Sequence, residues 1–427
     1  MRFIKMAAIA VIGLLAASWI AIAASNKVRL LVAKNYFKHE RPEWTPRLVK
    51  FGILRPVRMQ VANGVNMKLD PGDLVSLTIL RTRAWQPEIW DSLNTRLGPG
   101  AVLIDVGAHI GIFTLQGAAR VGPTGKVIAF EPNPETLVQL RSNIAASNEG
   151  SIVTVEPIAC TDKDQQLTLY ADRGSNTGAS SLSEKNAEAF DVAPKPYSVR
   201  GRPIDDVVNE LGLTRVDAIK IDVEGAEVGV LRGAAKTLEK FHPKVVIEID
   251  ERQLAAFDTK PSDVTGLLTA AGYKSSRRLD DTDWEFYCLC PENTMPSVRT
   301  ANVATSDQLV KGFYPIEEGA WRWTGKQFAI ALAVPKTPHP LLSVDVAVPQ
   351  VLLDQVGGST TLHARMGASE LAPQTFNAAG NFTYQRELPK IDGAQVVEVD
   401  FSVDKTVPPK GGDPRELGLV VLGASIK

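Results

Sequence analysis

The sequence predicts an α/β domain with a doubly wound sheet, followed by an all-β sandwich and preceded by one hydrophobic N-terminal helix. Between residues 61 and 292, short apolar runs alternate with helical stretches, which is the pattern that parallel α/β sheets produce. From about residue 306 to residue 427 no convincing helical pattern occurs. The length of 427 residues exceeds the size at which one hydrophobic core stops growing, so we expect more than one domain.

The N-terminal segment carries an uncharged apolar run at residues 6–24, with basic residues on both sides. A helix of 19 residues at 1.5 Å per residue just covers a bilayer core of about 30 Å. The run is longer than the core of a usual signal peptide, and basic residues follow it directly. We therefore expect a membrane anchor at residues 1–25 and a basic juxtamembrane segment at residues 26–60. Signal-peptide cleavage at the small residues 21–24 is the alternative.

The net charge of −1 conceals a division along the chain. Residues 1–58 carry a net charge of +9, and residues 59–427 carry −10. The acidic body argues against a general nucleic-acid binder, whereas the basic start suits a membrane face. The composition, with 44% hydrophobic and 22% charged residues, excludes a largely disordered or multispan membrane protein. Three cysteines without zinc-type spacing predict neither a disulfide framework nor a zinc site.

The elements of the first domain follow from its apolar runs. Residues 101–107 (AVLIDVG) form a near-continuous apolar strand, as expected for a strand buried on both faces of a parallel sheet. The stretch 173–203 is rich in Gly, Ser and Pro and predicts a long, lid-like loop. The other expected strands are 126–132, 151–159, 216–224 and 244–250, and the expected helices are 111–121, 134–147, 204–212, 226–240 and 261–272.

The second domain is predicted from β-like runs separated by Gly and Pro turns. Such runs indicate an all-β sandwich over residues 306–427. The runs are 327–335, 341–348, 360–366, 394–403 and 417–426.

The strongest site signal is the segment 105–111 (DVGAHIG), which directly follows the first buried strand and opens a helix. Glycines in such a loop let a ligand approach the backbone. The next strand ends at Glu131, where a carboxylate can accept hydrogen bonds from ribose hydroxyls. The spacing differs from the dinucleotide-binding Gly-x-Gly-x-x-Gly, which disfavours an NAD-dependent sugar dehydrogenase. S-adenosylmethionine, which has a ribose and no phosphate, suits this pair of acidic strand ends better.

A second cluster of charged residues lies at 220–227 (KIDVEGAE), at the end of the strand 216–224. In open α/β sheets, ligands bind beyond the carboxyl ends of the strands, so we expect both clusters at one edge. Strand alternation predicts that Lys220, Asp222 and Glu224 lie on one side. Such groups can orient a polyhydroxyl substrate and accept a proton from it.

Three segments, 102–115, 125–148 and 217–238 with 244–249, resemble the FkbM family of S-adenosylmethionine-dependent methyltransferases. The resemblance covers about residues 60–290, and two stretches depart from the family pattern, at Gln86 and at 203–205. It implies a Rossmann-like class I methyltransferase fold and O-methylation of a hydroxyl, often on a sugar or polyketide-type acceptor. The cofactor contacts that it implies are Asp105, Gly107, Ala108, Gly111, Glu131, Asn133, Cys160 and Asp162.

The reaction itself asks mainly for placement of the acceptor oxygen in line with the methyl carbon and the sulfur. A base that removes the hydroxyl proton is useful, and we expect Asp222 or Glu224 in this role, with His109 as a third candidate. Lys220 either assists or only forms a structural ion pair with a neighbouring carboxylate. No metal site is expected, although the carboxylates of this cluster do not exclude one.

Several predicted cofactor residues have a structural alternative. Asp105 and Glu131 either bind the cofactor or cap the helices that follow them, and we favour cofactor binding, so that alanine at either position abolishes binding and leaves the fold intact. Asn133 either contacts the ribose or shapes the turn before the next helix. Cys160 is otherwise a small buried apolar residue.

The β domain contains the aromatic segment 312–326 (GFYPIEEGAWRWTGK), and it resembles domains appended to bacterial glycan-processing enzymes. Aromatic and Arg side chains stack on sugar faces, so a glycan-binding module is one interpretation, and core packing is the other. We expect a membrane-anchored enzyme of a bacterial inner membrane with its catalytic domain in the cytoplasm, where the cofactor is made. The expected acceptor is a carbohydrate or glycolipid. A non-catalytic scaffold with a vestigial methyltransferase domain is the rival hypothesis.

Overall fold

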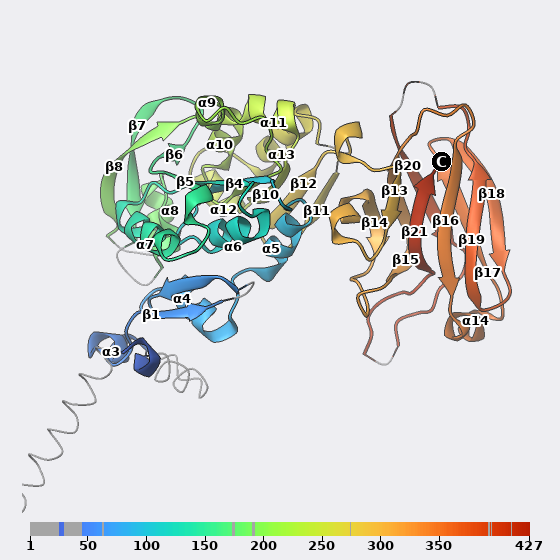
Figure 1. Ribbon diagram of the computed structural model, residues 1–427, viewed down its shortest axis with the longest axis horizontal. Helices are drawn as coiled ribbons and strands as arrows, with labels where there is room; N and C mark the ends of the chain where they lie inside the picture. The colour runs from blue at the N-terminus through green and yellow to red at the C-terminus, as the bar shows by residue number, and fades with distance from the viewer. Residues whose placement is uncertain are drawn as a thin grey trace, which may run out of the picture. The chain divides into compact units, whose positions relative to one another are not determined.

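The structure of the protein is a computed structural model that forms two compact units (Figure 1). It describes residues 25–29, 45–61, 64–172, 176–189, 193–273, 275–391, 393, 395–410 and 412–427. One unit comprises the described residues up to Gly272 together with Arg277–Phe286, and the other comprises Tyr273–Ser276 and Tyr287–Lys427. The expected anchor at residues 6–24 lies outside the described residues. Within the described part of the chain, no helix has the length and apolar character needed to cross a membrane.

The first unit is built on a seven-stranded sheet in the order β11-β12-β10-β9-β3-β4-β5. Strands β3, β4, β5, β9 and β10 run parallel, and β12 runs antiparallel to β10. The predicted doubly wound sheet is therefore present, and its strand order changes direction between β3 and β9. The strands are β3 (Val102–Val106), β4 (Lys126–Phe130), β5 (Val153–Glu156), β9 (Ala218–Ile221), β10 (Lys244–Glu248), β11 (Ser275–Arg278) and β12 (Asp283–Tyr287).

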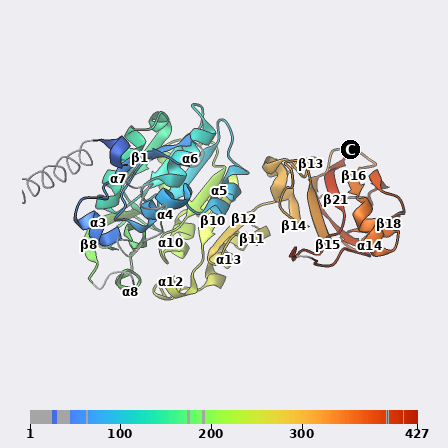
Figure 2. The ribbon, with the colours of Figure 1, turned by 90° about the horizontal axis from the view of Figure 1, so that it is seen from below.

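Helices cover both faces of this sheet, because right-handed crossovers that run in opposite directions from β3 and β9 place their helices on opposite sides. Figure 2 shows α6 and α10 on the two sides of the strands. The expected helix 226–240 is divided at Ala234 into α10 and α11. The helices of this unit are α3 (Thr45–Lys50), α4 (Leu74–Thr82), α5 (Pro87–Asn94), α6 (Ile112–Val121), α7 (Pro134–Ala145), α8 (Glu184–Glu188), α9 (Ile204–Glu210), α10 (Glu227–Gly233), α11 (Ala235–Phe241), α12 (Glu251–Ala255) and α13 (Pro261–Ala270).

Two small sheets flank the seven-stranded sheet. A hairpin of β1 (Val57–Gln60) and β2 (Asn66–Leu69) packs into the main core, and β6 (Ala159–Cys160), β8 (Lys195–Arg202) and β7 (Gln165–Ala171) form a three-stranded sheet. The prediction of a long loop over 173–203 was therefore wrong in its last part, where β8 pairs antiparallel with β7. The physical reason is that β8 is polar and largely exposed, so that it lacks the apolar alternation that marks a strand.

The second unit is an antiparallel β-sandwich whose two sheets share β15. Arg322 and Trp323 at the start of β15 pair with β21, whereas Gln327–Ala333 pair with β20 in the other sheet. The sheets face each other across a shared core, in which the Tyr384 and Phe401 rings lie 6.4 Å apart. The strands are β13 (Ser297–Arg299), β14 (Leu309–Phe313), β15 (Arg322–Ala333), β16 (Leu341–Val348), β17 (Thr360–Met366), β18 (Ser369–Phe376), β19 (Gly380–Glu387), β20 (Val396–Val403) and β21 (Val420–Ile426).

Two features of the second unit differ from the sequence-based expectation. A helix, α14 (Gln350–Val356), occurs where none was expected. It is only 7 residues long, which is too short for a helical period to be recognised, and Gly357 ends it in the left-handed conformation. In addition, a disulfide joins Cys288 and Cys290.

Candidate active site

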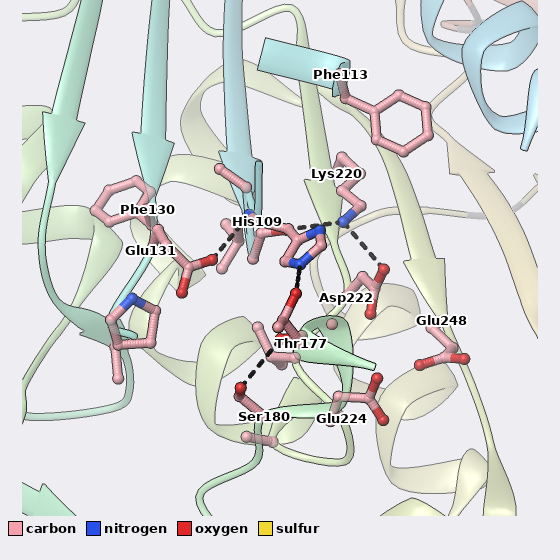
Figure 3. A pocket seen from close by; sticks show the side chains of 18 of the residues that line it. His109, Phe113, Phe130, Glu131, Thr177, Ser180, Lys220, Asp222, Glu224 and Glu248 are labelled. Atoms are coloured by element: carbon pink, nitrogen blue, oxygen red, sulfur yellow. Dashed lines mark hydrogen bonds and ion pairs between the residues drawn. The ribbon is translucent and has the colours of Figure 1, made fainter. Parts of the chain in front are cut away.

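A cavity of about 230 Å³ opens at the carboxyl ends of β3, β4, β9 and β10 in the first unit. This edge, where the strand order changes direction, is where ligands bind in doubly wound sheets. The cavity has an apolar part beside β4 and a carboxylate-rich part beside β9 and β10, which Figure 3 shows at close range. Of the predicted site residues, those that line the cavity are Gly107, Ala108, His109, Glu131, Cys160, Lys220, Asp222 and Glu224.

The loop after β3 is held against the neighbouring strand ends by its backbone. The amides of Gly107 and Ala108 donate hydrogen bonds to the carbonyl of Phe130, at 3.0 and 2.9 Å. Gly107 has a φ of +77°, and a Cβ at this position would lie 1.9 Å from the carbonyl oxygen of Asp222. Only glycine therefore allows the loops after β3 and β9 to approach this closely.

Glu131 is buried at the end of β4, and its carboxylate is fixed by two backbone amides. The amide of His109 donates to Oε2 and that of Asn133 donates to Oε1, both at 2.8 Å. Burial raises the pKa of Glu131 to about 7, although the two amides and Lys220 act in the opposite direction. The carboxylate is therefore pre-oriented at the wall of the cavity, where it can accept hydrogen bonds from a diol.

The remaining predicted cofactor residues do not line the cavity. Asp105 is fully buried within β3, where its Oδ2 accepts a hydrogen bond from the Thr114 hydroxyl at 2.5 Å. Its Oδ1 has no hydrogen-bond partner, and burial raises its pKa. Gly111 is the N-cap of α6, Asn133 caps α7 through its side chain, and Asp162 is exposed.

Lys220 lies between the two parts of the cavity with its ammonium group already occupied. Its Nζ donates to Asp222 Oδ2 at 3.1 Å and to the carbonyl of Gly107 at 3.2 Å, and it lies 5.5 Å from the centre of the Phe113 ring. Burial alone would lower the pKa of Lys220, but Asp222 and Asp105 outweigh it and the pKa is raised. Lys220 is therefore a permanent cation that neutralises adjacent carboxylates, and it is unsuited to act as a base.

Three carboxylates converge beside β9 and β10. Ligand oxygens of Asp222, Glu224 and Glu248 all lie within 4.8 Å of one another. Burial, followed by repulsion from neighbouring carboxylates such as Asp222, raises the pKa of Glu224 to about 8 and that of Glu248 to about 10. This arrangement can accept hydrogen bonds from several hydroxyls, and its ligand chemistry is also that of a divalent cation.

Sequence reasoning missed several cavity residues. Glu248 is the last residue of β10, so the rule that sites lie at carboxyl ends of strands, applied to the expected strand 244–250, would have identified it. Thr177 and Ser180 also line the cavity, but they come from the stretch that was treated as a loop and carried no pattern that pointed to the site. The apolar wall beside β4 consists of Phe130, Pro132, Ile158, Ala159, Cys160, Leu169 and Leu182.

The donor set fits S-adenosylmethionine. The apolar wall suits an adenine ring, and the adjacent Glu131 carboxylate suits the two ribose hydroxyls. Among the described residues that line the cavity, Lys220 is the only Lys or Arg, and its ammonium is already paired. A nucleotide carrying phosphates would find no free cation among these residues, whereas a phosphate-free nucleoside fits.

Comparison with known proteins identifies the class as a methyltransferase. A family model, described as the methyltransferase FkbM domain, matches residues 105–275. Three relatives are methyltransferase sdnD of Sordaria araneosa, 2-O-methyltransferase NoeI of Sinorhizobium fredii and hexuronic acid methyltransferase AglP of Haloferax volcanii. Methyltransferase sdnD is 31% identical over 43% of this chain and 76% of its own length. NoeI is 27% identical over 33% of this chain and 60% of its own length. AglP is 28% identical over 52% of this chain and 84% of its own length.

The chain belongs to the FkbM methyltransferase domain family, a class of enzymes that use S-adenosylmethionine as the methyl donor, and the resemblance seen in the sequence is confirmed. The matched region is confined to one part of the chain. It spans 60% of NoeI and 10% of the much longer antimetabolite synthetase AmbE of Pseudomonas aeruginosa, with which it is 29% identical.

Proposed function

We propose that the protein is an S-adenosylmethionine-dependent O-methyltransferase that methylates a hydroxyl of a carbohydrate or glycolipid. The observation that carries this proposal is the division of one cavity into two parts. A nucleoside-compatible part contains Glu131 and an apolar wall, and a hydroxyl-compatible part contains three carboxylates. The names of NoeI, a 2-O-methyltransferase, and AglP, a hexuronic acid methyltransferase, support O-methylation and a sugar acceptor.

When bound, the cofactor supplies a methyl group already activated by its sulfonium. The protein's contribution is to place the acceptor hydroxyl and to receive its proton. Asp222 lies at the junction of the two parts of the cavity, with its Oδ2 held by Lys220. We assign Asp222 to orientation of the hydroxyl and the ionised form of Glu224 to proton acceptance, because the pKa of Glu224, raised to about 8, lies near the working pH.

The test uses the full-length protein with tritiated S-adenosylmethionine and a panel of neutral glycans, glycolipids and polysaccharides. We expect label to enter an acceptor hydroxyl in the wild type and to be reduced about a hundredfold in Asp222→Asn, which is the loss typical of a misplaced acceptor. A protein that binds the cofactor and labels no acceptor of any class would support the scaffold hypothesis. A protein that does not bind the cofactor would contradict the proposal.

We also propose a membrane location for the protein and a docking role for its second unit. Residues 6–24 are supported as a membrane anchor by their apolar sequence, and cytoplasmic orientation is supported by the source of the cofactor. For the β-sandwich we propose a glycan-docking role, supported by the half-exposed Trp321 and Trp323. Tyr314 is already engaged within the domain, since its hydroxyl donates to the carbonyl of Glu416 and Arg415 lies over its ring.

A further inference from the structure

Residues 176–186, which we call the strap, form one wall of the cavity. The strap contains the short 3-10 helix Thr177–Ala179 and the start of α8. Five of its residues, Asn176, Thr177, Gly178, Ser180 and Leu182, line the cavity. Its only backbone hydrogen bonds to a strand, among those of the described residues, are the two between Ser181 and Tyr170 of β7. Side chains must therefore provide the rest of its attachment.

The first attachment runs from the cofactor loop through the strap to α4. His109 Nε2 lies 2.7 Å from Thr177 Oγ1, which lies 2.7 Å from Asp73 Oδ1 (Figure 3 shows the His109–Thr177 contact). A carboxylate only accepts, so the Thr177 hydroxyl donates to Asp73 and accepts from the Nε2–H of His109. Burial lowers the pKa of His109 and so favours the neutral ring. With its proton on Nε2, the neutral ring completes this series of hydrogen bonds.

The second attachment comes from Asn133, the N-cap residue of α7. Asn133 Nδ2 donates to Ser180 Oγ at 3.0 Å, and that hydroxyl donates to the carbonyl of Thr177 at 3.2 Å. The backbone amides of Asn133 and His109 are the same two groups that hold the Glu131 carboxylate. Each residue therefore uses its amide to fix Glu131 and its side chain to fix the strap.

The third attachment is at the carboxylate-rich part of the cavity. Ser181 Oγ and Asn186 Nδ2 both donate to the carbonyl of Glu224, at 2.9 Å. Asn186 Nδ2 also donates to the carbonyl of Gln253 at 2.9 Å. The strap is thus tied at one end to the residues that hold Glu131 and at the other end to the loop that carries Glu224.

From these contacts we infer that Thr177 and Ser180 are positioning residues, which act on the cofactor through His109, Asn133 and Glu131. The strap closes over the bound cofactor, and cofactor exchange requires the His109–Thr177 and Asn133–Ser180 hydrogen bonds to break. This inference rests on the proposed function, because it takes Glu131 as the cofactor's ribose ligand. The same strap closure fixes the backbone of Glu224, so that closure orders both parts of the cavity in one event.

The test compares Thr177→Val and Ser180→Ala with the wild type in the full chain. The measurement is the dissociation rate of tritiated S-adenosylmethionine after addition of excess unlabelled cofactor. We expect each variant to release the cofactor at least about fivefold faster, because each loses the hydrogen bond to His109 or Asn133 that couples the strap to the cofactor, and one neutral hydrogen bond corresponds to about that factor. Thr177→Ser, which keeps the hydroxyl, should restore the wild-type rate.

The matched control is Thr78→Val on α4, because the Thr78 hydroxyl donates only to the carbonyl of Leu74 within the same helix. This variant should release the cofactor at the wild-type rate. If Thr177→Val and Ser180→Ala are folded, as judged by circular dichroism at the assay temperature, and release the cofactor as slowly as the wild type, the inference is overturned.

Hydrogen exchange of the ligand-free protein separates this inference from the proposed function. If the wild type binds no S-adenosylmethionine, the proposed function fails and the coupling to the cofactor fails with it. Faster exchange of the amides of residues 176–186 in Thr177→Val, without faster exchange elsewhere, would still support the attachment of the strap. Unchanged exchange at these amides would overturn the attachment as well.

Discussion

At the scale of single residues, Glu131 combines a fixed geometry with a protonation state that lies near neutrality. Its pKa is raised to about 7 chiefly by burial and further by Asp105, while the amides of His109 and Asn133 and the charge of Lys220 limit the rise. A ribose diol donates hydrogen bonds, so it requires the ionised carboxylate. The ionised form predominates above the pKa, and protonation removes acceptor capacity below it.

We therefore expect the affinity for S-adenosylmethionine to fall by up to about tenfold per pH unit as the pH drops below 7, and to level off above pH 8. Calorimetric titrations between pH 5.5 and 8.5 measure this dependence. In Glu131→Gln the affinity should be low and independent of pH through this window. A wild-type affinity that does not change across this range would show that Glu131 is not the ribose ligand.

The burial of Asp105 changes what its alanine variant is expected to show. From the sequence, Asp105→Ala was expected to abolish cofactor binding without damage to the fold. In the structure the side chain is fully buried and is the acceptor for the Thr114 hydroxyl of α6. The alanine variant leaves that hydroxyl without a partner, so any loss of binding would be mixed with a loss of stability.

We expect Asp105→Ala to lower the free energy of unfolding by about 1–3 kcal/mol, the cost of an unsatisfied buried polar group. The double variant Asp105→Ala, Thr114→Val should recover part of this loss, because it removes both polar partners. Urea denaturation followed by circular dichroism measures both values. Equal stability of Asp105→Ala and the wild type would show that the Thr114 hydrogen bond contributes nothing.

At the scale of elements, the loop after β3 is the most tightly constrained segment of the site. A Cβ on Gly107 would lie 1.9 Å from a backbone oxygen, whereas a Cβ on Gly122, at the end of α6, would meet nothing within 4 Å. Both glycines have positive φ, at +77° and +66°. The pair therefore separates the cost of a backbone with positive φ from the cost of the steric clash.

Gly122→Ala is expected to cost about 1–3 kcal/mol of stability, because Gly122, with a φ of +66° and a ψ of −173°, has a backbone conformation that is nearly exclusive to glycine. Gly107→Ala should cost at least about 3 kcal/mol, within the range of severe overpacking, and should abolish cofactor binding by separating the loops after β3 and β9. Chemical denaturation and calorimetry of the two variants test this. Comparable losses in both variants would mean that the loop moves freely away from Asp222.

The sequence predicted the elements that have a strong hydrophobic pattern and the residues that directly follow a buried strand. Strand β3 was visible because all five of its residues are buried, and Glu131 was visible because it follows the next buried strand. Strand β8 was not visible because it is polar and largely exposed. The strap was not visible because its order depends on hydrogen bonds that join Thr177, Ser180 and Asn186 to distant residues, which leave no local pattern. Helix α14 was missed because its 7 residues span only about two turns.

At the scale of the whole molecule, the distribution of charge on the protein predicts which acceptor substrates it prefers. The body of the chain carries a net charge of −10 over residues 59–427, and three carboxylates gather beside β9 and β10. Within the described cavity wall, Lys220 is the only permanent cation, and Asp222 and Asp105 compensate its charge. The acceptor part of the cavity is therefore negatively charged above about pH 8, where Glu224 is ionised.

An acceptor with a carboxylate should be disfavoured relative to its neutral counterpart. At pH 8.5, above the pKa of Glu224, we expect a neutral hexose-based acceptor to have a kcat/KM about tenfold higher than the corresponding uronic acid, the ratio for one like-charge contact of roughly 1–2 kcal/mol near a protein surface. The difference should shrink with added salt. Competition between the two acceptors in one reaction measures the ratio, and a preference for the uronic acid in metal-free buffer would contradict it.

The shared strand of the second unit has a consequence for how that unit opens. Because β15 pairs with β21 through Arg322 and Trp323 and with β20 through Gln327–Ala333, neither sheet can separate from the other without loss of β15 hydrogen bonds. The sandwich should therefore behave as one cooperative exchange unit, in which the slowest amides of both sheets share a single opening free energy. Loss of the β15 hydrogen bonds and global unfolding of this unit should therefore be the same event.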